Sequence, residues 1–222
     1  MRIGRRCDVV ELKPLEAKSG LDQDVLMEAF VSQMEMHHEL VKGDTEGLLA
    51  PAPIAHYTGS RPAALMRRAD CDFTQWLKKM RSEILWNRSE RKKWCMMALK
   101  HCLRIARGVH FIHMNHNTAH CDVKTDNIFL YNGLAHLGDL PNGKGEYYYN
   151  DYKKMVSLLL EVIRPINMVI FHSTVYQLAV DFRRLIDRVK NVEVVRDMQR
   201  IFRGRMEKIV EELEELIAKH SD

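Results

Sequence analysis

The chain has 222 residues, of which 46% are hydrophobic and 29% are charged, and its formal net charge is +4. This length supports one domain with a sizeable core, and the composition is that of an ordinary folded protein. So small a charge does not indicate binding to nucleic acid. No apolar run approaches the ~20 residues that span a bilayer, so we expect no transmembrane segment.

The first third of the chain is expected to hold short strands and one helix. Residues 7–13 alternate in polarity and favour a strand that ends at Lys13, before a proline. From residue 22 to 40 apolar side chains recur at helical spacing, with Asp22 placed to cap the helix. Residues 48–57 and 61–67 are apolar stretches bounded by proline, which suit two more strands.

The remaining two thirds favour helices. Helices are predicted at residues 72–81, 90–114, 151–164, about 166–190 and about 204–220, and Asn132-Gly133 predicts a hairpin turn. The last helix carries one apolar stripe that we expect to pack on its own domain, with a partner helix as the alternative. Strands first and helices afterwards predict an α+β fold with a small sheet-bearing end and a larger helical end.

The five cysteines are odd in number and scattered: Cys7, Cys71, Cys95, Cys102 and Cys121. This favours free thiols in the cytoplasm or another reducing compartment. The basic first residues are not followed by the apolar core of a signal peptide. The histidines between residues 110 and 120 do not have the spacing of a closed zinc set, so we expect them to serve packing.

The polar loop at residues 119–130 carries Asp122, Lys124 and Asn127, followed by an apolar run. In phosphoryl transfer a protein mainly positions groups and neutralises charge, so this spacing has a chemical interpretation. Asp122 would orient a substrate hydroxyl and accept its proton, and Lys124 would steady the transferred phosphate. Asn127 would hold a magnesium ion.

Written as His120-x-Asp122-x-Lys124-x-x-Asn127, this loop resembles the catalytic loop of the protein kinase family. Further segments resemble the family in the same order. Residues 10–13 look like the strand that carries the lysine for the ATP phosphates, here Lys13. Glu28 matches the glutamate that pairs with that lysine, with Glu35 as a competitor for the role. Residues 151–161 resemble the buried helix whose leading Asp ties down the catalytic loop.

The resemblance implies ATP and Mg²⁺ as cofactors. It places Met66 as the gatekeeper, Arg67 to Ala69 as the hinge, and Phe129 in the nucleotide site. Asp139 lies twelve residues past Asn127, where the family has the Asp of its Asp-Phe-Gly motif, so the implied metal ligands are Asn127 and Asp139. The implied fold is a truncated, two-lobed kinase-like domain with a reduced lobe over residues 1–68 and a helical lobe over residues 69–222.

Four departures from the family are visible. Only twelve residues precede Lys13, too few for the glycine-rich loop that cradles the phosphates, so we expect weaker nucleotide binding. Leu140 and Pro141 follow Asp139 in place of Phe and Gly, and proline restricts that turn. The spacing from Asp139 to Asp151 is about a third of the family's, too short for an activation segment and peptide platform.

The fourth departure is Cys121, which replaces the Arg that anchors a phosphorylated activation loop. We therefore expect no control by activation-loop phosphorylation. Small effector kinases of pathogens share such trimming, and the resemblance to them implies delivery into a host cell as one further expectation.

The expected activity is transfer of the ATP γ-phosphate to Ser or Thr of a protein substrate, because a lysine two positions after the catalytic Asp resembles the serine/threonine branch. The alternative is a pseudokinase that binds and regulates a kinase or its substrate, with or without ATP. A third interpretation is a scaffold that binds ATP without transferring it.

Basic clusters at residues 67–68, 78–81 and 88–93 are expected to form a solvated face. A docking surface for an acidic partner or a phospholipid is the alternative.

Overall fold

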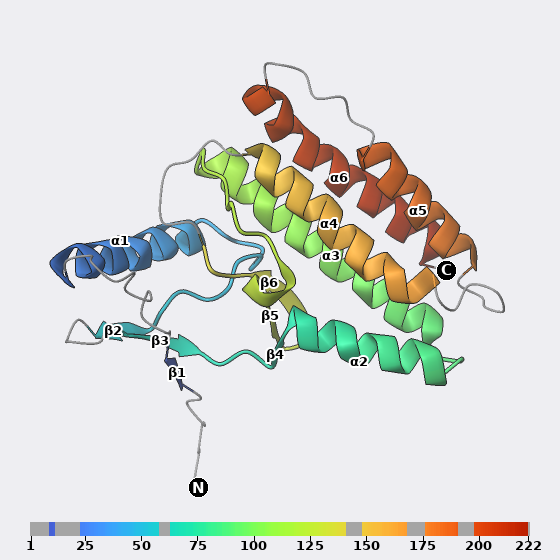
Figure 1. The fold of residues 1–222 in the computed structure, drawn as a ribbon, viewed down its shortest axis with the longest axis horizontal. Helices are drawn as coiled ribbons and strands as arrows, with labels where there is room; N and C mark the ends of the chain where they lie inside the picture. The colour runs from blue at the N-terminus through green and yellow to red at the C-terminus, as the bar shows by residue number, and fades with distance from the viewer. Residues whose placement is uncertain are drawn as a thin grey trace, which may run out of the picture.

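The computed structural model describes residues 9–11, 23–57, 63–140, 148–167, 176–190 and 198–221. Lys13 and Pro141 lie outside these ranges. Figure 1 shows a sheet-bearing part, which contains the first helix, beside a larger part made mainly of helices. In the described residues no helix is both long enough and apolar enough to cross a membrane.

The smaller part is an antiparallel sheet covered by one helix. Strand β3 (Ala63–Arg67) lies between β1 (Val9–Glu11) and β2 (Ala55–Tyr57), with Met66 opposite Val10. Helix α1 (Gln23–Lys42) packs on this sheet through a small core of Phe30, Met34 and Ala64. This core is separate from the large core of the helical part.

A second antiparallel sheet joins the two parts. It has the order β4 (Cys71–Asp72), β5 (Ile128–Tyr131), β6 (Leu134–Leu137). The turn between β5 and β6 has φ of +52° at Asn132 and +74° at Gly133, as a tight hairpin turn requires. The expected hairpin is therefore confirmed.

The chain that follows α1 is anchored on this second sheet. The amide of Ala50 donates to the carbonyl of Leu137 at 2.7 Å, and the amide of Leu137 donates to the carbonyl of Leu48 at 2.9 Å. The expected strand at residues 48–57 is thus only partly right. Prolines at positions 51 and 53 lack an amide donor and interrupt the strand, and pairing with β3 begins only at β2.

The helical part surrounds α3 (Arg91–Asn115), which packs against α4 (Tyr148–Asn167) and α6 (Met198–His220). Helices α2 (Phe73–Trp86) and α5 (Tyr176–Lys190) complete this part (Figure 1). The apolar stripe of α6 is buried, as expected for packing on its own domain. The helices were expected in the right order, although α2, α4 and α6 each extend beyond the expected bounds. The helix expected at about 166–190 is described as α5 from Tyr176 onward, and residues 166 and 167 belong to α4.

Local hydrogen bonds fix both ends of α2. The carboxylate of Asp72 accepts from the amide of Gln75 at 2.7 Å, which caps the first turn. At the other end the buried guanidinium of Arg91 donates to the carbonyls of Ile84 and Leu85, at 2.6 and 3.2 Å. These carbonyls have no partner within the helix, so Arg91 also sets the sharp corner into α3.

The described cysteines are free thiols: Cys71, Cys95, Cys102 and Cys121. Burial raises the pKa of Cys95 and of Cys102 to about 12, so both stay protonated at neutral pH. Cys7 lies outside the described residues.

Candidate functional site

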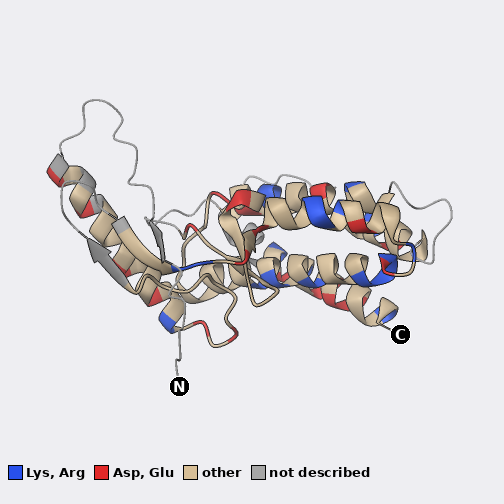
Figure 2. Cartoon of the chain, turned by 90° about the horizontal axis from the view of Figure 1, so that it is seen from below, with Lys and Arg blue, Asp and Glu red and all other residues tan. Residues whose placement is uncertain are grey.

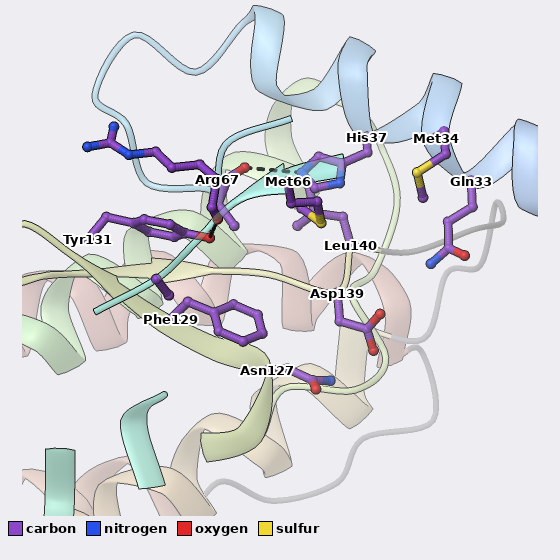
Figure 3. Close-up of a pocket in the computed structure, with 12 residues that line it drawn as sticks. Gln33, Met34, His37, Met66, Arg67, Asn127, Phe129, Tyr131, Asp139 and Leu140 are labelled. Atoms are coloured by element: carbon purple, nitrogen blue, oxygen red, sulfur yellow. Dashed lines mark hydrogen bonds between the residues drawn. The ribbon is translucent and has the colours of Figure 1, made fainter. Parts of the chain in front are cut away.

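A pocket of about 200 Å³ lies where α1, β3 and β5 meet (Figure 3). Six residues expected in the site from the sequence line it: Met66, Arg67, Ala69, Asn127, Phe129 and Asp139. The remaining lining residues were not anticipated: Gln33, Met34, His37, Ala50, Tyr131 and Leu140. The pocket therefore brings together segments from both parts of the molecule.

The connection between the parts is held against β5. The hydroxyl of Tyr131 donates to the carbonyl of Arg67 at 3.2 Å, and the guanidinium of Arg67 lies 6.0 Å from the centre of the same ring. The amide of Asp70 donates to the carbonyl of Leu130 at 2.7 Å. These contacts place the backbone of residues 67–69 along one rim of the pocket.

Phe129 and Gly138 shape the floor. A Cβ atom built on Gly138 would lie 2.5 Å from two ring carbons of Phe129, so only glycine lets the ring occupy its position. The amide of Gly138 also donates to the carbonyl of Asn127 at 2.8 Å. The ring of Phe129 thereby faces the cavity beside the polar residues (Figure 3).

Helix α1 forms the opposite wall. Nε2 of the buried His37 donates to the carbonyl of Ala50 at 3.1 Å, and burial lowers the pKa of this histidine. One turn earlier, the side chain of Gln33 extends into the pocket (Figure 3). Glu28, expected to pair with Lys13, is exposed and does not line the pocket. Because Lys13 lies outside the described residues, that pairing stays a prediction.

Asp122, Lys124 and Asn127 contact one another. Oδ2 of Asp122 accepts from the ammonium of Lys124 and from Nδ2 of Asn127, the latter at 2.9 Å. Burial alone would raise the pKa of Asp122, but the hydrogen bonds from Lys124 and Asn127 outweigh it and lower that pKa. The carboxylate is therefore ionised at neutral pH. In the same pair, the hydrogen bond to Asp122 raises the pKa of Lys124.

The backbone of this loop is held in place by Asp151, whose side chain is completely buried. Its carboxylate accepts from the amides of His120 and Cys121, each at 2.6 Å, and from Nε2 of His113 at 2.8 Å. A buried carboxylate is stable only with such donors. Asp151 therefore ties down the loop as expected from the sequence, although α4 begins three residues before it, at Tyr148.

His120 links this loop to the segment that carries Asp139. Its Nε2 donates to the carbonyl of Gly138 at 2.8 Å, and its Nδ1 accepts from the amide of Asp122 at 3.3 Å. Burial lowers the pKa of His120, which agrees with a neutral ring that donates on one side and accepts on the other. The expectation of a buried core histidine is confirmed.

Two oxygen donors fit a divalent cation. Nδ2 of Asn127 is used by the backbone and side chain of Asp122, whereas its Oδ1 accepts no hydrogen bond from the described residues. The carboxylate of Asp139 is exposed and has no partner within the same ranges. Figure 3 shows both side chains at one end of the pocket. Hard oxygen ligands of this kind suit Mg²⁺.

Histidine and cysteine side chains do not form a metal site in the described residues. In the part of the chain that the structure describes, no three His, Cys, Asp or Glu side chains gather as a metal site.

Comparison with known proteins agrees with this architecture at the level of the fold. No protein-family model matches the chain, and no curated protein sequence matches it. Among solved structures, it is similar to the kinase domain of maize SIRK1 (sucrose-induced receptor kinase 1) bound to AMP-PNP. The TM-score is 0.55 at 13% sequence identity, over 83% of this chain and 80% of that one. The protein therefore has a protein kinase-like fold.

Proposed function

We propose that this protein is a phosphotransferase that moves the γ-phosphate of ATP to a Ser or Thr hydroxyl of a protein substrate. The observation that carries the proposal is the position of Asn127. Its side chain lines the pocket beside Asp139, and its amide nitrogen donates to Asp122 at 2.9 Å. One residue thus joins the pocket to the ionised carboxylate that would accept the proton.

The residues of the loop have separate roles in the reaction. Asp122 orients the substrate hydroxyl and accepts its proton as the hydroxyl oxygen bonds to the γ-phosphorus. The bond from that phosphorus to the β–γ bridging oxygen breaks, and ADP leaves. Lys124 supplies a positive charge close to the transferred group. Positioning and charge neutralisation of this kind are the main contributions that proteins make to phosphoryl transfer.

The pocket offers matching surfaces to the nucleotide. The adenine ring would lie against Phe129, with its edge toward the backbone between Arg67 and Ala69. Asn127 and Asp139 would hold Mg²⁺, which neutralises phosphate charge when bound. Met66 limits the depth of the cavity.

Two measurements, Mg-ATP binding and transfer of the γ-phosphate, test the proposal in the variants Asp122→Asn and Asp126→Asn. Mg-ATP at millimolar concentration should raise the melting temperature of the wild type, because a ligand that binds the folded state stabilises it. Asp122→Asn should keep this stabilisation and lower label transfer from γ-labelled ATP by about 100-fold or more. Asp126→Asn is the matched control, because Asp126 lies on the same loop and accepts instead from Thr74 at 2.7 Å. Undiminished transfer by Asp122→Asn would contradict the role of Asp122.

A second candidate is a pseudokinase that binds ATP or a partner without transfer. The observation in its favour is that only eleven residues separate Asp139 from Asp151, which leaves little chain for a peptide platform. ATP binding without transfer in the wild type would support this candidate. Absence of any stabilisation by Mg-ATP would leave only a binding module that does not use the nucleotide.

A further inference from the structure

Positive charge is concentrated in one corner of the molecule. Residues 73–94 contain seven Lys and Arg but only two Glu, a net +5, whereas the whole chain carries +4. The other 200 residues are thus close to neutral, at −1. Figure 2 shows acidic and basic positions mixed along the helices of the larger part. Arg91 is buried, and the other six basic residues of this segment are exposed or half-exposed.

These charges share a face with an exposed aromatic residue. Along α2, Lys78, Lys79, Ser82 and Trp86 fall within about 100° of one another, and all of them are exposed. The ammonium of Lys79 lies 5.8 Å from the ring centre of Trp94 on α3, so the face continues onto the next helix. We call this face, together with residues 87–93, the α2–α3 corner.

Trp86 is the most exposed large hydrophobic residue in the described ranges, at 85%. It is the last residue of α2, at the end of that helix away from the small sheet (Figure 1). The exposed indole shares its helix face with the charges of Lys78 and Lys79, and a tryptophan beside basic residues is typical of segments that lie at a membrane surface. Thirteen residues of helix separate it from the start of α2 beside β4, so a ligand at this corner leaves the pocket open.

We propose that the α2–α3 corner binds the surface of a membrane rich in anionic phospholipids. The exposed cations are spread along α2 and over residues 87–93 rather than gathered at one point, which fits a diffuse anionic surface. The indole of Trp86 belongs in the headgroup layer, where tryptophan is favoured because its ring is both apolar and a hydrogen-bond donor. The proposal does not depend on the phosphotransferase activity.

Co-sedimentation with vesicles tests the proposal. The full chain should bind vesicles of phosphatidylcholine with about 30 mol% phosphatidylserine and not vesicles of phosphatidylcholine alone, and added salt should weaken binding. Each lysine removed in Lys78→Ala/Lys79→Ala should weaken binding about fivefold. Trp86→Ala should weaken it about tenfold. The control for the lysine variant is Lys153→Ala/Lys154→Ala, which removes two exposed lysines of α4. The control for Trp86→Ala is Ile54→Ala, which removes an exposed apolar side chain elsewhere. Both controls should bind vesicles as the wild type does.

A second readout separates insertion from simple attraction. Lipids brominated on their acyl chains should quench part of the tryptophan fluorescence. Trp86→Ala should remove most of this quenching, because Trp76 is buried and Trp94 is only half-exposed beside Lys79. Vesicle binding that the Lys78/Lys79 and Lys153/Lys154 variants lose equally would overturn the assignment to this corner. Binding to soluble polyglutamate but not to anionic vesicles would overturn the membrane proposal and indicate an acidic protein partner.

Discussion

Two non-glycine residues of the site have a backbone that side chains normally avoid. Cys121 has φ of +68° and Asp139 has φ of +50°. Each such conformation costs on the order of 1–3 kcal/mol and persists only where the surroundings enforce it. Here the enforcement is visible, because Asp151 binds the amide of Cys121 and His120 binds the carbonyl next to Asp139. The strain therefore lies at the two points where the proposed base and metal ligand are positioned.

Gly138 is predicted to be necessary for the shape of the pocket. In Gly138→Ala the new methyl group would meet the ring of Phe129 at 2.5 Å and push it into the cavity. We expect a loss of about 1–3 kcal/mol in unfolding free energy. Stabilisation by Mg-ATP should be lost as well, and both can be measured by thermal unfolding with and without the nucleotide.

Gly133→Ala is the matched control for that change. Gly133 has φ of +74° but no atom within 4 Å of an added Cβ. This variant should lose about 1 kcal/mol through backbone strain alone and should keep the response to Mg-ATP. An unchanged response in Gly138→Ala would show that the Phe129 ring does not define the nucleotide site.

Gln33 is predicted to face the phosphates of the nucleotide. Its side chain points into the pocket, whereas Glu28 is exposed on the same helix. Gln33→Ala should weaken ATP about tenfold, the value of one hydrogen bond to a charged acceptor, and should leave adenosine unaffected. Glu28→Ala is the comparison, and calorimetric titration of both ligands is the measurement. A larger loss in Glu28→Ala would instead support its pairing with Lys13.

At the scale of elements, the sequence predicts what is local. The loop from His120 to Asn127 and the turn at Asn132-Gly133 are each specified by neighbouring residues, and the structure brings the loop residues together. The rotation of α1 about its axis is different, because it is decided by the burial of Phe30, Met34 and His37 against other segments. Sequence spacing alone therefore could not identify Gln33 as the residue at the pocket wall.

The contact between α5 and α6 is predicted to respond to acid through Asp181. Burial would raise the pKa of this carboxyl, but hydrogen bonds from Lys219, His220 and Gln177 lower that pKa to about 2. A lowered folded-state pKa means that the stabilisation is present above pH ~4 and is lost as the pH falls toward ~2. At neutral pH, Asp181→Asn should lose on the order of 1 kcal/mol.

Urea unfolding at a series of pH values measures this effect. The difference in unfolding free energy between wild type and Asp181→Asn should shrink as the pH falls below ~4. Asp187→Asn changes an exposed carboxylate of the same helix and should show no such difference. A difference that stayed constant into acid would mean that the charge of Asp181 is not what links the two helices.

At the scale of the whole molecule, the two parts differ in the size of their described apolar cores. Among the side chains that the structure describes, the helical part has a large continuous core, while α1 and its sheet share a core of three buried side chains. The pocket lies between them, so a nucleotide bound there would contact both. The order of elements made the kinase-like fold predictable. The contacts that join the parts, such as Ala50 with Leu137, depend on tertiary pairing and were not predictable.

The same architecture predicts activity without phosphorylation. The loop that carries Asp122 is held by the buried Asp151, and Cys121 offers no guanidinium to a phosphate. Residues 140–150 contain no Ser or Thr, so tyrosines 147–149 are the hydroxyl side chains of that segment. Treatment of the purified protein with a phosphatase of broad specificity should therefore leave the initial rate of transfer from γ-labelled ATP within about twofold, measured after removal of the phosphatase. A fall of about tenfold or more in this rate would contradict the prediction. It would show that a phosphate elsewhere on the chain orders the site, because an added phosphate acts mainly by ordering a segment through new charged hydrogen bonds.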